Sequence, residues 1–179
     1  MFSYSDIKKD WFNREGRRNV YNTDIDFYNC GGFALGTYSW YTPYSRHFEK
    51  EDMIDLIVES IQEGYSYEEI TSEILNHFEK QMLKDFDNLR PVAAEYVEKE
   101  NEELIAFRIF YDIEFFDFDE VDFFDFDFHY RVKRKGNWLE KCGDGPITPC
   151  NNSREAWGLY DEEGLCYDSE IRYYVRTLN

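Results

Sequence analysis

The sequence predicts an α+β protein in which helices from the first half of the chain pack on an antiparallel β-sheet formed by the second half. Apolar residues recur at helical spacing through most of the first half, whereas from about residue 92 they alternate with polar residues. The chain has 179 residues, of which 42% are hydrophobic, so it is long enough to bury a sizeable core. We therefore expect a single domain over 1–179, mainly helical in 1–90 and mainly antiparallel sheet in 91–179.

The first predicted helix spans 30–41 and carries Cys30 in its first turn. Its apolar side chains recur at helical spacing, and Pro43 should end it because proline cannot continue a helix. The two glycines that follow Cys30 lower helix propensity, but near a helix start they let another backbone or a substrate come close. Residues 1–28 are polar and aromatic and are predicted to form a lead-in segment.

Two further helices are expected before the sheet. A helix over 51–63 has its apolar residues on one face, with Gly64 where a C-terminal cap belongs. The next helix has the clearest start signal in the chain, a capping box formed by Ser66 and Glu69. Apolar residues then recur every four positions, at Ile70, Ile74, Phe78 and Met82.

The second half opens with a strand over 104–115 that is rich in β-branched and aromatic residues. It leads into 112–128, where eight acids and seven phenylalanines occur within seventeen residues. Alternation with a period of two places the rings on one face of a strand and the carboxylates on the other. The alternation changes phase at Phe115 and again at Phe123, which predicts bulges or a turn near 119–120.

A two-residue turn at 135–136 should join the next two strands into a hairpin. With that turn, Arg131 faces Glu140 and His129 faces Cys142, so His129 and Glu140 become diagonal neighbours on one face of the sheet. The C-terminal region is then predicted as a loop over 142–156.

Two last strands, over 157–161 and 166–177, should complete the sheet, with a turn at 162–164 between them.

The four cysteines could form two disulfides in three ways, but nothing else in the sequence favours an oxidising compartment. No CxxC pair is present, and the spacing does not fit a zinc ribbon. The polar N-terminus argues against a signal peptide, and no run approaches the ~18 apolar residues of a membrane span. We therefore expect a cytoplasmic protein with reduced thiols and no membrane segment. The cysteines are Cys30, Cys142, Cys150 and Cys166.

Cys30 and His129 are the best candidates for chemistry. Unpaired backbone N–H groups and the helix dipole favour a thiolate at the start of a helix. A thiol hydrolase also needs an imidazole from elsewhere in the fold to carry the proton, and a carboxylate to orient that imidazole. Glu140 is the preferred orienting carboxylate, and Asp127, two residues before His129 on the same face, is the alternative.

Each of these residues also has a structural interpretation. A free cysteine such as Cys30 is often a small buried hydrophobic residue. His129 would then be an exposed strand residue that balances nearby acids. The other two histidines, His47 and His77, are weaker candidates for the base, and His77 is expected at the edge of the core.

The segment Asn-Cys-Gly-Gly-Phe-Ala-Leu at 29–35 and the segment Asp-Phe-His-Tyr at 127–130, which is followed by Trp138 and Gly143, carry a family resemblance. Together with the helical pair, they resemble papain-like cysteine peptidases, with NlpC/P60-type hydrolases and their phage-encoded relatives as the nearest group. In that superfamily a helix-borne cysteine packs against an antiparallel sheet and the base histidine lies on a strand.

This resemblance implies that Cys30 is the nucleophile, His129 the base and Glu140 the orienting residue. It also implies a protein or peptide-like amide as the substrate and no cofactor. The superfamily includes members that keep the fold and lose the chemistry, so a catalytically degenerate descendant has the same sequence features.

The net charge of −18 supports a second hypothesis, which needs no enzyme. Such a chain repels nucleic-acid phosphate but attracts a basic protein surface, so direct nucleic-acid binding is not expected. A row of carboxylates along a strand could imitate a phosphate backbone and occupy the basic groove of a host nucleic-acid-binding protein. Phage anti-defence proteins, including anti-CRISPR inhibitors, often have this character. The row consists of Asp117, Asp119, Asp122, Asp125 and Asp127.

The same carboxylates could be read as a cation site, because oxygen ligands suit Ca²⁺ and Mg²⁺. The sequence lacks the glycine-bearing loop of an EF-hand, and strand spacing would spread the carboxylates apart, so no metal is expected. Phosphate-binding loops and the motifs of metalloproteases and serine hydrolases are also missing from the sequence.

Overall fold

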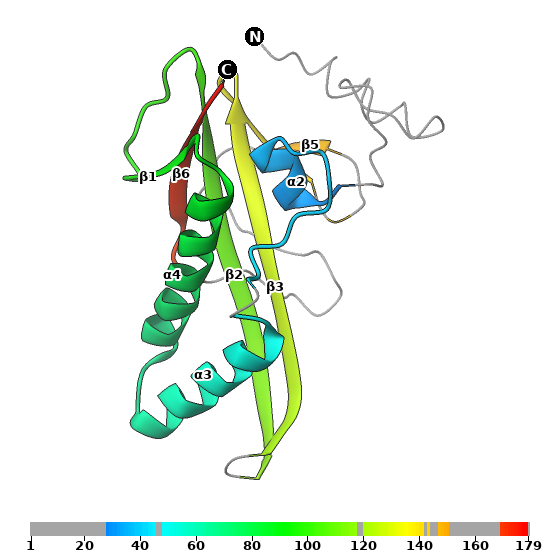
Figure 1. The fold of residues 1–179 in the computed structure, drawn as a ribbon, viewed down its shortest axis with the longest axis vertical. Helices are drawn as coiled ribbons and strands as arrows, with labels where there is room; N and C mark the ends of the chain where they lie inside the picture. The colour runs from blue at the N-terminus through cyan, green and yellow to red at the C-terminus, as the bar shows by residue number, and fades with distance from the viewer. Residues whose placement is uncertain are drawn as a thin grey trace, which may run out of the picture.

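The structure is a computed structural model that describes residues 28–45, 48–117, 120–141, 143, 147–150 and 169–178. This part of the chain forms an α+β fold with three helices and one six-stranded antiparallel sheet (Figure 1). The predicted α+β class is therefore confirmed. The predicted lead-in segment and the predicted strand over 157–161 lie outside the described residues, apart from Tyr28.

The helices are α2 (Cys30–Leu35), α3 (Lys50–Glu63) and α4 (Tyr67–Asp85). The strands are β1 (Leu89–Val92), β2 (Glu102–Asp117), β3 (Glu120–Arg134), β4 (Asn137–Lys141), β5 (Ile147–Cys150) and β6 (Arg172–Thr177). Their order in the sheet is β1-β6-β2-β3-β4-β5, so the C-terminal strand lies between the first two strands of the chain. The longest strands, β2 and β3, extend well beyond their neighbours as a two-stranded ribbon (Figure 1).

The two longer helices match their predictions. Helix α3 ends at Gly64, whose left-handed backbone (φ 86°) caps the last turn. Helix α4 begins with the predicted capping box, in which the Glu69 amide donates to the Ser66 hydroxyl at 3.3 Å and the Ser66 amide donates to the Glu69 carboxylate at 2.8 Å.

The first helix is shorter than predicted, because it ends at Leu35 and not near residue 41. Gly36 adopts a left-handed conformation (φ 72°) and its amide donates to the carbonyl groups of Gly32 and Phe33, which closes the helix. The apolar pattern beyond Gly36 was misleading, since Tyr38 and Tyr41 pack against the core from an irregular segment.

The predicted hairpin is present with its predicted register, in which Arg131 pairs with Glu140. Its two turn residues, Lys135 and Gly136, both have positive φ angles (49° and 82°), as a tight two-residue turn requires. The predicted irregularity of the long ribbon is also present at Phe115, where the β2–β3 register shifts. On β3 the ladder passes from Phe123 to Val121 and skips Asp122, so the second predicted irregularity, at Phe123, is present as well.

Two short strands were missed. Strand β5 lies within the predicted loop 142–156, and β1 extends the sheet into the half that was predicted as mainly helical. Strand β1 contains Pro91, which is compatible with the edge of a sheet, because an edge strand leaves one side of its backbone without ladder bonds. Strand β6 lies inside the predicted strand over 166–177.

The sheet contacts α2 and α4 through one of its faces. Tyr130 donates a hydrogen bond to the sulfur of Met82 in α4 at 3.1 Å, and its cross-strand partner Phe107 packs against Phe78. From the same face, Arg134 lies over the ring of Phe33 in α2, with 4.3 Å between its guanidinium carbon and the ring centroid. The phenylalanines of β3 that share this face are half-buried against the core, as the alternation predicted.

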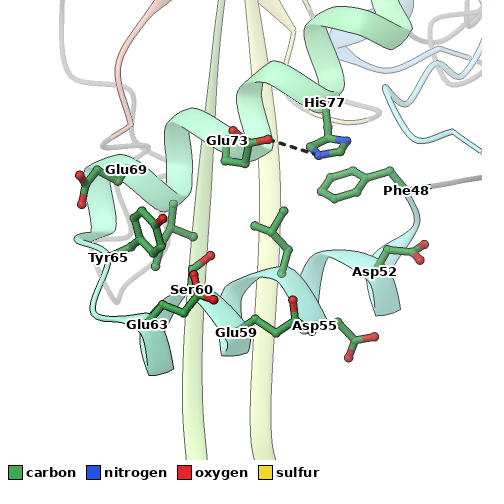
Figure 2. Close-up of a pocket in the computed structure, with 12 residues that line it drawn as sticks. Phe48, Asp52, Asp55, Glu59, Ser60, Glu63, Tyr65, Glu69, Glu73 and His77 are labelled. Atoms are coloured by element: carbon green, nitrogen blue, oxygen red, sulfur yellow. Dashed lines mark ion pairs between the residues drawn. The ribbon is translucent and has the colours of Figure 1, made fainter.

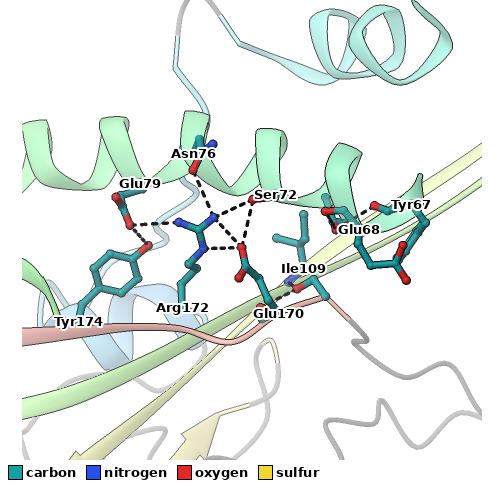
Figure 3. Close-up of polar contacts among 11 residues, drawn as sticks. Tyr67, Glu68, Ser72, Asn76, Glu79, Ile109, Glu170, Arg172 and Tyr174 are labelled. Atoms are coloured by element: carbon teal, nitrogen blue, oxygen red, sulfur yellow. Dashed lines mark hydrogen bonds and ion pairs between the residues drawn. The ribbon is translucent and has the colours of Figure 1, made fainter. Parts of the chain in front are cut away.

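Helix α4 contributes to two surface features. On one side it faces α3 across an open groove (Figure 2). On another side it is tied to β6, where Arg172 donates to Ser72 at 3.1 Å and to Asn76 at 3.2 Å (Figure 3). These bonds hold the N-terminal half of α4 against the start of β6.

The close approach of two backbone segments at Gly32 predicts that no side chain fits there. A Cβ atom on Gly32 would lie 1.8 Å from the carbonyl oxygen of Ser39, which is a backbone atom and cannot turn aside. We expect Gly32→Ala to lower the free energy of unfolding by about 2 kcal/mol in urea denaturation, although alanine favours helix. Gly31→Ala is the matched control, because its Cβ would lie 3.0 Å from the Tyr41 carbonyl oxygen. Equal losses in the two variants would contradict this explanation.

Candidate active site

Asn29 fixes the start of the helix that carries Cys30. Its side-chain oxygen accepts hydrogen bonds from the amides of Gly32 (3.0 Å) and Tyr41 (3.1 Å), and its side-chain nitrogen donates to the Tyr41 carbonyl (2.7 Å). Asn29 is thus an N-cap and also a clamp between the helix and the segment that follows it. Cys30 is consequently held in the first position of α2.

The thiol of Cys30 lies beside the backbone of β3, with its sulfur 3.8 Å from the carbonyl oxygen of Phe128. Among the described residues, β4 pairs with β3 only as far as Arg131. The edge of β3 next to Phe128 is therefore not covered by β4. Cys30 approaches the strand at this edge, close to where His129 follows Phe128 in the chain.

The imidazole of His129 faces the carboxylate of Glu140, as the hairpin register predicted. The distance from Nε2 of His129 to Oε2 of Glu140 is 3.4 Å. The same carboxylate oxygen is 2.7 Å from Nε of Arg131, so one oxygen is shared by two cationic side chains. The alternative orienting residue, Asp127, uses a carboxylate oxygen to accept from the amide of Phe128 at 2.8 Å.

Both Cys30 and Glu140 influence the pKa of His129. Burial alone would lower this pKa, but hydrogen bonds to the Cys30 thiol and to the Glu140 carboxylate, and the charges of both groups, outweigh it and raise the pKa from 6.5 to about 9. His129 therefore lies close enough to the predicted nucleophile and to the predicted orienting residue for both to act on its pKa. The three predicted catalytic residues come together.

The pKa of Glu140 moves in the opposite direction. Burial raises it, but the hydrogen bond to His129 and the charge of Arg131 outweigh the burial, and the pKa lies below its usual value. At neutral pH the group is accordingly a carboxylate beside a protonated imidazole.

Both candidate groups are largely enclosed, since Cys30 and His129 are each 5% exposed. His129 is thus buried, and not the exposed strand residue that its structural interpretation required. Tyr130, whose ring lies close to Gly31, closes the site from the face of the sheet. Enclosure strengthens the interaction between charged groups because it excludes water from the space around them.

Two contributors were not recognised from the sequence. Asn29 was noted only as part of the motif, although asparagine directly before a helix start is a common N-cap. Arg131 was paired with Glu140 in the predicted register, but its role in holding the carboxylate beside His129 was not anticipated.

The remaining candidates lie elsewhere. His77 stacks on Phe48 with 4.1 Å between the ring centroids, at the edge of the core as predicted, and its Nε2 lies 3.6 Å from Glu73. His47 lies outside the described residues, as do Cys142 and Cys166.

The predicted row of carboxylates is only partly described. Asp122 is exposed on β3, and Asp125 and Asp127 are half-buried on the same strand. Asp119 and the side chain of Asp117 lie outside the described residues.

Across the described ranges, no group of three or more histidine, cysteine or acidic side chains could hold a metal ion. Within those ranges, none of the helices has the length and apolar character needed to cross a membrane.

Comparisons with known proteins identify no relative. A scan against models of protein families found no match, and searches of curated proteins and of solved structures found no significant similarity.

The raised pKa of His129 predicts a pH dependence of stability. Because the folded pKa (about 9) exceeds the unfolded value of about 6.5, the stabilisation is fully present below pH 6.5 and is lost as the pH rises through 9. Its full size should be on the order of 3 kcal/mol. Urea denaturation between pH 6 and pH 9.5 should show this loss in the wild type and a flatter profile in His129→Gln. His77→Gln is the control and should keep the wild-type profile; an unchanged profile in His129→Gln would contradict the assignment.

Proposed function

We propose that Cys30, His129 and Glu140 are the catalytic triad of a cysteine hydrolase that acts on a protein or peptide-like amide in the cytoplasm. The observation that carries this proposal is the convergence of the three residues. The Cys30 sulfur lies 3.8 Å from the carbonyl oxygen of Phe128, the residue before His129, and the His129 imidazole lies 3.4 Å from Glu140. A thiol hydrolase has this arrangement, in which the base lies between the nucleophile and the carboxylate that orients the base.

The proposed reaction has two steps. His129 takes the proton of the Cys30 thiol before the substrate binds, and the sulfur of this thiolate–imidazolium pair attacks the carbonyl carbon of the amide. His129 then gives the proton to the leaving amine, and the acyl group remains on sulfur as a thioester. A water molecule, deprotonated by His129, attacks the thioester and releases the acid and the free thiol.

The start of α2 supplies donors for the oxyanion. Asn29 satisfies the Gly32 amide, whereas the amides of Cys30 and Gly31 have no hydrogen-bond partner among the described residues. Such amides at a helix start favour negative charge on a nearby oxygen.

The order of the elements supports a papain-like arrangement of the NlpC/P60 type. Within the described residues a short helix with the cysteine comes first, and the histidine and the third residue lie on two neighbouring antiparallel strands, β3 and β4. A descendant that has lost activity would have the same layout, so reactivity of the thiol is the property to measure.

Alkylation by iodoacetamide tests the proposed triad. We expect Cys30 to react faster than the half-buried Cys150, because His129 removes the proton of Cys30. His129→Gln should slow the alkylation of Cys30 by about 100-fold, the usual size of a general-base contribution. Glu140→Gln should slow it by a smaller factor, and Asp127→Asn is the matched control and should have little effect.

Mass spectrometry after timed quenching assigns the rate to each cysteine, and circular dichroism checks that the variants are folded. Equal rates at Cys30 and Cys150, unchanged by His129→Gln, would indicate a structural cysteine and overturn the proposal. Cys30→Ala should abolish hydrolysis of any amide substrate found.

A second candidate function, binding to a basic protein surface, is favoured by one observation in the ribbon. Asp112 and Asp125 lie directly opposite each other across β2 and β3, although like charges in that position destabilise a sheet. Neither makes an ion pair with another described residue. Phe116, which is 77% exposed, adds an apolar contact near the same end of the ribbon. A basic partner would neutralise this surface, as it would in an inhibitor that imitates nucleic acid.

Joint neutralisation of Asp117, Asp119, Asp122 and Asp125 to asparagine tests the second candidate. We expect the wild-type protein to displace a fluorescent DNA duplex from a basic nucleic-acid-binding protein, and the neutralised variant to lose most of that effect. Higher salt should weaken the displacement, because the attraction is electrostatic. Displacement that is indifferent to both changes would end this hypothesis.

A further inference from the structure

Helices α3 and α4 enclose an open groove with a volume of about 510 Å³ (Figure 2). The wall from α3 is one helical stripe, since its lining residues recur at intervals of one, three or four positions. The groove is walled in part by α3, which lies beside the far part of the β2–β3 ribbon, away from α2 (Figure 1). It is thus a surface separate from the candidate active site.

The walls of the groove carry one sign of charge. Six carboxylates line it, and neither lysine nor arginine is among the lining residues. Two of the six stabilise helix starts, because Asp52 and Glu69 belong to capping boxes. A third, Glu73, faces His77. The other three are Asp55, Glu59 and Glu63.

These three carboxylates occupy positions that weaken the isolated helix. Asp55, Glu59 and Glu63 follow one another at intervals of four residues, where like charges repel. Glu63 is also the last residue of α3, and negative charge is unfavourable at the C-terminal end of a helix dipole. None of the three has a hydrogen bond or ion pair with another described residue. This arrangement is explained if a partner supplies the positive charge.

The groove also offers apolar contacts between its acidic walls. Leu56 from α3 and Ile70 from α4 line it, and Tyr65, in the connection between the helices, is 52% exposed. The stacked pair of Phe48 and His77 closes one end (Figure 2). Small cations bound to the carboxylates would make no contact with these apolar side chains.

We propose that the groove between α3 and α4 binds a basic amphipathic helix of a partner protein. Lysine or arginine residues four positions apart would pair with Asp55, Glu59 and Glu63, and apolar residues between them would pack on Leu56 and Tyr65. The stripe from Asp52 to Glu63 spans roughly 16 Å, which corresponds to three turns of a bound helix. This assignment does not depend on chemistry at Cys30.

A designed peptide tests the proposal without a known partner. The probe is a fluorescent peptide of lysine, leucine and alanine in which lysines at four-residue spacing flank a leucine stripe. A second peptide has the same composition in scrambled order, so that it carries equal charge without an apolar face. Fluorescence anisotropy in 150 mM salt measures the dissociation constant of each peptide for the full-length chain.

The variant Asp55→Asn/Glu59→Gln/Glu63→Gln should bind the amphipathic peptide about tenfold more weakly than the wild type. The matched control is Asp87→Asn/Glu95→Gln/Glu100→Gln, which removes three exposed carboxylates outside the groove. It should change the affinity less than twofold. Tyr65→Ala should weaken the amphipathic peptide and leave the scrambled peptide unchanged.

Circular dichroism should show that every variant keeps the wild-type helix content. Equal weakening by both triple variants would show that the peptide responds only to the overall charge of −18, and would overturn the proposal. Equal affinity for the two peptides would overturn the amphipathic partner. Thiol alkylation at Cys30 is the independent readout for the other site, and the groove variant should leave its rate unchanged.

Discussion

The antiparallel pairing of β2 with β3 determines which side chains meet the helices and which lie on the other face of the sheet. Phe107 lies opposite Tyr130, and both contact the core, whereas the next pair, Arg108 and His129, belongs to the opposite face. A shift by one residue would exchange these two sets. It would put His129 under the helices and remove it from Glu140. The register therefore positions the core and the candidate active site together.

The contact between His129 and Glu140 could be predicted from the sequence because it depends on a local feature of the hairpin. A tight turn at Lys135 and Gly136 fixes the hairpin register, and the diagonal contact follows from strand geometry. The meeting of Cys30 with β3 could be anticipated only by resemblance, since nearly one hundred residues separate them. The length of α2 was overestimated because the aromatic residues after Gly36 continue the apolar pattern from outside a helix. Strand β5 could not be recognised, because four residues with a proline give little periodic signal.

Charge in the candidate active site is distributed unevenly. The protonated His129 and Arg131 share one oxygen of Glu140, so two cations lie beside one carboxylate. A thiolate at Cys30 would bring a second negative charge to the imidazole, in a place from which water is largely excluded. In the proposed hydrolase, the interaction of His129 with Glu140 that stabilises the folded state would also orient the imidazole toward the sulfur. Structure and reactivity would then rest on one interaction.

The acidic groups outside the candidate active site differ from Glu140 in their neighbours. The carboxylate of Glu140 lies beside two cationic side chains, whereas the carboxylates of the α3 stripe and of the Asp112–Asp125 pair lie beside other carboxylates. A surface that served only solubility could have spread the same charge over positions without this cost. Their concentration on α3 and on the β2–β3 ribbon, each next to exposed aromatic side chains, supports the proposal of a basic partner. Recognition would then occur at one end of the molecule, and chemistry at the other.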